Sequence, residues 1–374
     1  MNLKWLLKTS LTILKNFLYD HCSKVNFSVT YKCNQLCQTC NIWNIYKKNP
    51  ELKKQEFSLK EFNIFFKKNP HLIWVSLTGG EPFLREDISD IICSAIENIR
   101  NLRVISITTN GSMPEKIEND IYKILNFTEN PPFLFISISL NGPQSVHNAL
   151  SRVSDSYQRA LETFRRLDKI NKKYNKLKVG FEYTFSRFNS GRLRDTLRSL
   201  AKEDIVISLD KWTFPVAQES CYYNLSSQTR LSPNLDMLNQ ELNWIFKKYP
   251  KKFFENPFSL ISYTYLKLAF RYANTKNRFP CAAITHSCFI DPYGMVYPCI
   301  FMLKKLGDLR TNDFSLKKIL RSKKTERTKE LLKRNCQGCW TPCEAYQSIV
   351  FKPSLFFKSL MKSKHEKRRD RQAK

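Results

Sequence analysis

The sequence predicts an α/β protein: a partial (β/α)6 TIM-like barrel followed by a small cysteine-rich C-terminal domain. Three observations support this fold class. Apolar β-rich runs alternate with stretches of helical period between residues 25 and 209. Cysteine or glycine motifs accompany four successive β-rich runs. Six of the twelve cysteines lie between residues 281 and 343. A chain of 374 residues with 42% hydrophobic content can bury a large core.

The first predicted element is a basic amphipathic helix within residues 1–22. Leucines recur at helical spacing with lysines between them, at Leu3, Leu7, Leu11, Leu14 and Leu18. The pattern leaves two interpretations open: the helix packs on the following domain, or it lies on a membrane surface. The lysines interrupt the apolar stretch of residues 1–19, which argues against a secretion signal. No span of the chain approaches the roughly 20 apolar residues of a transmembrane helix.

Strands and helices then alternate. Strands are predicted at residues 25–30, 72–77, 103–108, 133–140, 177–185 and 205–209. Helices are predicted between them at residues 59–68, 88–99, 115–125, 157–172 and 193–201. Because a helix occupies each crossover, the strands should be parallel, and right-handed crossovers should curl the sheet into part of a barrel.

Motifs whose residue types suit ligand binding or catalysis occur at the ends of four consecutive predicted strands. CNQLCQTC follows the first strand, TGGEP the second and TTNGS the third, and the run SLNGP marks the end of the fourth. The carboxyl ends of parallel strands meet at one rim of a barrel, where active sites of this fold lie. We therefore expect these motifs to share one site.

The predicted segments divide the chain into five parts. Residues 1–22 form the basic helix, 23–231 the barrel core and 232–277 a helical connector. Residues 278–350 form the cysteine-rich domain, and 351–374 form a basic tail that we expect to be a solvated helix end or disordered.

The chain is strongly basic. It carries 62 Lys and Arg against 33 Asp and Glu, a formal charge of +29. Such a charge attracts nucleic acid or an acidic membrane surface, although lysines spread over solvated faces would give the same excess. Without a secretion signal, the expected location is cytoplasmic, with a peripheral membrane position as an alternative. In that compartment clustered cysteines are more often metal ligands than disulfides.

Cys33, Cys37 and Cys40 form a C-x3-C-x2-C motif directly after a predicted strand. Iron-sulfur cubanes are held by cysteine thiolates, and four are needed for a fully ligated cluster. Three clustered cysteines would leave one iron open to a ligand. A zinc site is the competing interpretation, but structural zinc needs four protein ligands and only the distant Cys22 precedes the triplet.

The triplet, the GGEP run and the partial barrel together resemble the radical S-adenosylmethionine (SAM) superfamily over residues 25–210. The resemblance implies a [4Fe-4S] cluster at Cys33, Cys37 and Cys40, whose open iron binds SAM and whose reduction yields a 5′-deoxyadenosyl radical. It also implies SAM contacts, with the backbone and carboxylate of Gly79-Gly80-Glu81-Pro82 holding the amino group. Asn110 is either a SAM contact or part of a turn. Ser139 and Arg152 are implied contacts of the SAM ribose or carboxylate.

The C-terminal cysteines resemble the SPASM or twitch auxiliary-cluster domain of the same superfamily. Residues 289–299, FIDPYGMVYPC, would form a hairpin that presents cysteines. Six cysteines are too few for two fully ligated cubanes, so one auxiliary cluster is expected. Two ligand sets remain open, Cys281, Cys288, Cys299 and Cys343, or Cys281, Cys299, Cys336 and Cys339. A zinc ribbon is the alternative. The isolated Cys22, Cys93 and Cys221 are expected to be buried apolar residues.

The resemblance implies an enzyme that modifies a peptide or protein side chain, or another small molecule, with an external electron donor such as ferredoxin or flavodoxin. An RNA substrate is an alternative because of the basic charge. A membrane-lipid precursor is another alternative because of the basic N-terminal helix. A non-catalytic metal-binding scaffold is a third possibility, which the combination of triplet and GGEP disfavours. No residue is assigned as the acid or base that acts on the substrate.

Overall fold

Strands form in the order that the sequence predicts and assemble into one sheet. The computed structural model describes residues 3–19, 21–219, 230–249, 257–275, 279–336, 339, 341–352 and 354–360. The strands are β1 (Lys24–Thr30), β2 (Trp74–Gly79), β3 (Val104–Thr109), β4 (Phe133–Ser139), β5 (Leu177–Glu182), β6 (Trp212–Thr213), β7 (Ser287–Ile290), β8 (Met295–Tyr297) and β9 (Gly307–Asp308). Their order in the sheet is β6-β5-β4-β3-β2-β1-β7-β8-β9.

Strands β1 to β6 are all parallel and neighbour one another in chain order, which is the winding of a (β/α) barrel. In the described residues, β6 and β9 are the two edges of the sheet, so the barrel is open. The predicted fold class, a partial (β/α)6 barrel, is therefore confirmed.

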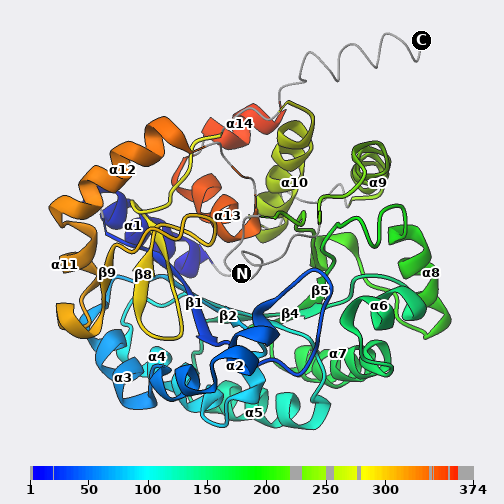
Figure 1. Ribbon diagram of the computed structural model, residues 1–374, viewed down its shortest axis with the longest axis horizontal. Coiled ribbons are helices and arrows are strands. Elements are labelled where there is room, and N and C mark those ends of the chain that lie inside the picture. The colour runs from blue at the N-terminus through cyan, green and yellow to red at the C-terminus, as the bar shows by residue number, and fades with distance from the viewer. Residues whose placement is uncertain are drawn as a thin grey trace.

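Helices flank this sheet (Figure 1). They are α1 (Leu3–Leu18), α2 (Ile45–Lys48), α3 (Leu59–Lys68), α4 (Ile88–Asn98), α5 (Pro114–Asn126), α6 (Gln144–Ser151), α7 (Ser156–Lys173), α8 (Leu193–Lys202), α9 (Leu235–Lys248), α10 (Pro257–Thr275), α11 (Leu316–Leu320), α12 (Lys323–Asn335), α13 (Pro342–Phe351) and α14 (Ser354–Leu360). None of the helices in the described residues is long and apolar enough to cross a membrane.

The sixth predicted strand, at residues 205–209, is wrong. Ile205 instead donates its backbone N–H to the carbonyl of Leu200 at 2.9 Å, which closes the C-terminal turn of α8. Val206 is 92% exposed. The chain reaches the sheet only at β6, where Trp212 pairs with Phe181. Residues 205–208 therefore form an irregular segment that follows α8 and contains the β-branched residues that favoured a strand.

The two faces of the strands differ in chemistry because side chains alternate. Outward residues such as Phe27 are buried against α3, with the Phe27 and Phe62 rings 4.8 Å apart. On the opposite face, Trp74 stacks on Tyr346 of α13, and the Lys24 ammonium donates to the Cys343 carbonyl at 2.9 Å. Figure 1 shows α3, α4, α5 and α7 along the outer side, with α10 and α13 across the open side.

The predicted cysteine-rich segment continues the barrel sheet. Strand β7 pairs in parallel with β1, and β8 and β9 follow as antiparallel neighbours. The turn between β7 and β8 packs on the core: Phe57 donates its N–H to the carbonyl of Pro292 at 2.7 Å, and a Cβ at Gly294 would lie 2.8 Å from the Phe57 ring. The predicted boundaries at residues 231, 277 and 350 stay predictions.

Candidate functional site

The cysteine triplet lies in the loop that leaves the carboxyl end of β1. Two backbone hydrogen bonds hold this loop on the end of α6: Leu36 donates to the Ser151 carbonyl at 3.1 Å, and Gln38 donates to the Leu150 carbonyl at 2.9 Å. Within the loop, Cys40 donates its N–H to the Cys37 carbonyl at 3.2 Å. The loop therefore has a fixed backbone that turns three half-buried cysteines toward one region.

Burial raises the pKa of all three thiols. The pKa of Cys33 rises to about 11 and that of Cys40 to about 12. The pKa of Cys37 is raised by burial and further by the neighbouring Cys40 and Cys33 thiols. With these raised pKa values the three groups are neutral thiols at neutral pH, and they would ionise together only beside a cation. No three His, Cys, Asp or Glu side chains in the described residues surround one metal-ion position. In an iron-sulfur cluster each thiolate binds a different iron, so such ligands need not meet at one point.

The GGEP run joins the end of β2 to the start of the cysteine loop. Gly80 donates its N–H to the Thr30 carbonyl at 2.7 Å, and Glu81 donates to the Lys32 carbonyl at 2.8 Å. A Cβ at Gly80 would lie 2.1 Å from the Lys32 carbonyl oxygen, and Gly79 has a φ of +125°. The two strand ends approach each other so closely that only glycine fits.

The Glu81 carboxylate is engaged inside the protein. It accepts hydrogen bonds from the Thr109 hydroxyl at 2.8 Å, the Asn110 N–H at 2.7 Å and the Phe83 N–H at 3.1 Å. The side chain is fully buried, and burial raises its pKa to about 7 although those three hydrogen bonds oppose the rise. The carboxylate thus ties the end of β2 to the end of β3. The resemblance had implied a contact to the SAM amino group for it.

Asn110 lies beside the triplet. Its amide nitrogen donates to the Asn34 side-chain oxygen at 2.9 Å and lies 4.0 Å from the Cys33 sulfur. Its side-chain oxygen accepts the N–H of Ser112 at 2.9 Å, and Gly111 has a φ of +69°. The residue is therefore part of a turn and also faces the cysteine loop.

The remaining predicted contacts occupy the same rim. Pro82 begins a short 3-10 helix and is buried. Ser139 is the last residue of β4 and is half-buried. Arg152, at the end of α6, has a φ of +57°, and its charge lowers the pKa of Cys37 in opposition to burial. The structure thus brings the end of α6 close to the triplet.

Glu182 is a candidate that the sequence analysis missed. It ends β5, where its backbone pairs with Ser139 of β4 and Thr213 of β6. Burial raises the pKa of its carboxyl to about 7, and no hydrogen bond to this carboxylate occurs within the described residues. The carboxylate lies close enough to Tyr346 and Cys343 on α13 to affect both side chains. Burial raises the pKa of each to about 12, and the negative charge of Glu182 adds to the rise. A charged residue at an inward position of a strand was the available signal.

The C-terminal cysteines divide into separate groups. Burial is the main cause of the strongly raised pKa of Cys339, and Cys299, Cys281 and Cys336 add to it. Cys299, Cys281 and Cys336 therefore each lie close to Cys339, and Cys281 also lies close to Cys299. Cys343 lies in the first turn of α13, close to Lys24. None of the described cysteines forms a disulfide.

Cys288 occupies a different environment. It lies on β7, fully buried in the core, with its sulfur 3.9 Å from that of Cys22. The structure therefore brings together Cys281, Cys299, Cys336 and Cys339, which is one of the two predicted sets, and it places Cys288 with Cys22. Cys93 is buried on α4, and Cys221 lies outside the described residues.

Two family models match the chain. Residues 27–205 match the radical SAM superfamily, and residues 281–340 match SPASM, an iron-sulfur cluster-binding domain. The first match runs from the second half of β1 through β5 and α8, and the second covers β7 to β9 and most of the C-terminal cysteines.

Curated relatives match only a short stretch. Molybdenum cofactor biosynthesis protein 1 of Bos taurus is 37% identical over 93 residues, which are 24% of this chain and 14% of that protein. GTP 3′,8-cyclase of Aquifex aeolicus is 36% identical over 92 residues, 23% of this chain and 27% of that protein. The match thus spans 14% and 27% of the length of these two relatives.

Solved structures share the fold over more of the chain. The structure of anSMEcpe with bound AdoMet and Kp18Cys peptide has a TM-score of 0.57 at 14% identity, and the match covers 90% of this chain and 98% of that chain. Streptococcus suis SuiB bound to S-adenosylmethionine has a TM-score of 0.56 at 14% identity, with 83% and 68% covered. At this identity the likeness concerns the fold.

Proposed function

Because the chain belongs to the radical SAM superfamily and carries a C-terminal SPASM domain, we propose that it is an enzyme that modifies a peptide or protein side chain. When bound, the [4Fe-4S] cluster and SAM supply a 5′-deoxyadenosyl radical that abstracts hydrogen from a substrate. The observation that carries the substrate class is the shared fold with the peptide-bound anSMEcpe structure, over 90% of this chain.

The proposed ligands of the first cluster are Cys33, Cys37 and Cys40. Their fit rests on three thiols grouped in one loop after β1, where Cys40 and Cys33 lie close enough to Cys37 to raise its pKa. Such thiols would ionise beside the cationic irons of a cluster. The proposed role of Gly79 and Gly80 is to let the β2 end approach this loop, and that of Glu81 is to fix the β3 end beside it. Asn110, Ser139 and Arg152 are the proposed SAM contacts.

One auxiliary cluster is proposed at Cys281, Cys299, Cys336 and Cys339. The support is that the Cys299, Cys281 and Cys336 thiols all lie close enough to Cys339 to raise its pKa. The set containing Cys288 lacks this support because Cys288 contacts Cys22 in the core. An external donor such as ferredoxin or flavodoxin is the proposed electron source, and the formal charge of +29 favours an acidic protein partner.

The substrate class is tested with deuterium. Peptide, RNA and lipid fractions from cells grown in heavy water are offered separately to the reduced enzyme with unlabelled SAM. We expect 5′-deoxyadenosine one mass unit heavier only with the peptide fraction, because hydrogen is abstracted from the substrate. Protease treatment of that fraction should remove the label transfer for a protein-sized substrate. Transfer from RNA or lipid alone would replace the proposed substrate class.

Glu182 is the proposed residue that exchanges a proton with the substrate. It is the carboxylate at the β5 end without a hydrogen-bond partner in the described residues, and it lies between Ser139 on the rim and Tyr346 on α13. We expect Glu182→Gln to slow substrate modification by about 10² to 10⁴. Release of 5′-deoxyadenosine without substrate should change less than about twofold, since the cysteine loop is untouched. Glu129→Gln, at an exposed position, is the control.

The same substitution should change the pH dependence of stability. The folded-state pKa of Glu182 is raised to about 7 from 4.5. The contribution of this carboxyl to the free energy of unfolding is therefore fully present below about pH 4.5 and is lost as pH rises through 7. The glutamine variant should therefore be more stable than wild type at pH 8, by about 1 kcal/mol for a half-buried group. Urea denaturation at pH 5 and pH 8 measures the difference. An equal loss of stability at both pH values would contradict this assignment.

A further inference from the structure

Helix α1 packs on the protein with its polar side. Asn16 is 2% exposed and donates to the Ser23 hydroxyl at 2.9 Å and to the His71 carbonyl at 2.8 Å. Thr9 and Thr12 are half-buried. The last three leucines of the predicted stripe lie on the other side of the helix: Leu11, Leu14 and Leu18 are 58%, 52% and 67% exposed.

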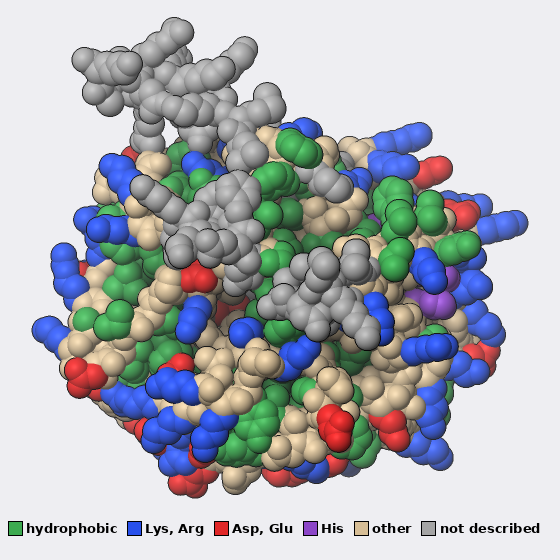
Figure 2. Space-filling view, turned by 180° about the vertical axis from the view of Figure 1, so that it is seen from behind, with side chains coloured by type: hydrophobic (Ala, Val, Ile, Leu, Met, Phe, Trp, Pro, Cys, Tyr) green, Lys and Arg blue, Asp and Glu red, His purple; other side chains and the backbone are tan. Residues whose placement is uncertain are grey.

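This orientation is the reverse of that expected for an amphipathic helix that covers a core. Soluble proteins rarely expose a contiguous apolar patch without a partner for it. Phe17 and Tyr19 extend the patch, with 53% and 63% exposed. Figure 2 shows hydrophobic side chains gathered beside the histidines on the flank of the molecule where α1 lies.

The apolar stripe is bordered by cations. Lys8 and Lys15 are exposed on α1 itself. At the C-terminal end of α1, Arg321 donates to the Tyr19 carbonyl at 2.8 Å and lines a groove with His21, Lys68 and Lys317. Lys68 and Lys317 are exposed and form no ion pair with a described residue. We call Lys68, Lys317 and Arg321 the basic groove.

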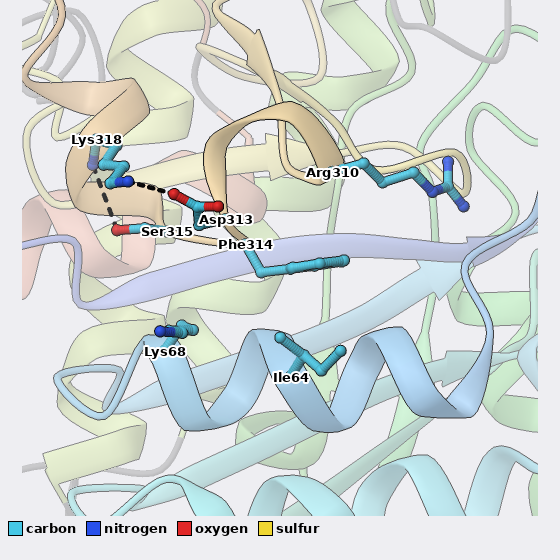
Figure 3. A pocket seen from close by; sticks show the side chains of 7 residues that line it. All are labelled: Ile64, Lys68, Arg310, Asp313, Phe314, Ser315 and Lys318. Carbon is cyan, nitrogen blue, oxygen red and sulfur yellow. Dashed lines mark hydrogen bonds and ion pairs between the residues drawn. The ribbon is translucent and has the colours of Figure 1, made fainter.

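A second hollow adjoins the basic groove between α3 and the segment before α11. Figure 3 shows Lys68 on its floor, with Lys318 paired to Asp313 opposite. Arg310 at its edge pairs with Glu61. Lys318 and Arg310 are thus paired, whereas Lys68 forms no ion pair with a described residue, although its charge helps to lower the pKa of Asp313.

The combination of exposed leucines and unpaired cations on one surface indicates which kind of partner can bind there. A second copy would bring like-charged lysines together, and a nucleic acid would leave the leucines in water. An anionic bilayer satisfies both, because leucines enter the acyl region while lysines bind lipid phosphates. We infer that α1 and the basic groove form a docking surface for a membrane containing anionic phospholipid.

The test is flotation of the full-length reconstituted enzyme with vesicles of phosphatidylcholine, alone or mixed with phosphatidylglycerol. Wild type should float with the mixed vesicles and be released by salt. The triple variant Leu11→Asn, Leu14→Asn and Leu18→Asn should bind at least tenfold more weakly. Lys68→Gln and Lys317→Gln should each weaken binding about fivefold.

The control variant replaces Phe127, Val206 and Leu331 by Asn, since these side chains are 46%, 92% and 42% exposed on other elements. It should float as wild type does. All variants should cleave SAM at the wild-type rate, which separates this surface from the proposed function. Equal flotation of the leucine variant and wild type, or no flotation of wild type, would overturn the inference. A dimer in solution that the leucine variant dissociates would overturn it in favour of a second copy.

Discussion

Replacing Cys33, Cys37 and Cys40 by alanine is expected to abolish the release of 5′-deoxyadenosine from SAM. These are the grouped thiols at the carboxyl end of β1, where burial and mutual repulsion oppose thiolates without a cation. The reconstituted variant should lose one cluster and keep the auxiliary one, so bound iron should fall from about eight to about four per chain. Iron analysis and chromatography of the nucleoside after anaerobic dithionite reduction measure both effects.

The matched control is Cys93→Ala, because Cys93 is buried on α4 among apolar side chains. It should keep the wild-type iron content and nucleoside yield, with a loss of stability of about 1 kcal/mol from the removed sulfur. If the triple variant still released nucleoside, or if the control lost as much iron, the assignment of the first cluster would be wrong.

Gly80→Ala is expected to lower SAM cleavage at least about a hundredfold. A Cβ there would lie 2.1 Å from the Lys32 carbonyl oxygen and 2.6 Å from its carbon, both backbone atoms that cannot rotate away. The β2 end must then move off the cysteine loop, which breaks the bond from the Glu81 N–H to that carbonyl. The free energy of unfolding should fall by about 3 kcal/mol or more.

Gly307→Ala is its control. Its Cβ would meet only side-chain atoms of Ile319, at 3.1 Å, which can shift by a few tenths of an ångström. We expect wild-type SAM cleavage and a loss of about 1 kcal/mol or less. Thermal unfolding and SAM-cleavage assays of both variants make the comparison. An active Gly80→Ala enzyme would show that the close approach of β2 to the loop is not needed.

The regular elements were predictable because local and tertiary preferences agree in them. The helix predicted at 59–68 is α3, whose start Ser58 and Glu61 fix through a capping box. The strand predicted at 205–209 is absent because Ile205 closes the end of α8 and Val206 points into solvent. Sequence pattern alone does not distinguish a strand from a β-rich segment used in a helix C-terminus.

The site was predictable where a motif needs a particular backbone geometry. It was less predictable where the hydrogen-bond partners of a residue lie far away in the sequence. Gly79 and Gly80 lie at a close strand approach, as expected for glycines. The engagement of Glu81 depends on Thr109 and Asn110, which arrive from β3. Likewise, the leucine stripe of α1 was evident in the sequence, but its outward direction depends on Asn16 bonding to His71. Long-range partners of this kind are not encoded in local spacing.

The measurement that tests the central claim most directly is electron paramagnetic resonance of the dithionite-reduced enzyme before and after addition of SAM. A variant with Cys281, Cys299, Cys336 and Cys339 replaced by alanine isolates the first cluster. In the proposed cluster, the iron without a protein ligand would bind SAM, so the signal should change when SAM is added. A signal that SAM leaves unchanged would contradict a SAM-binding cluster at Cys33, Cys37 and Cys40.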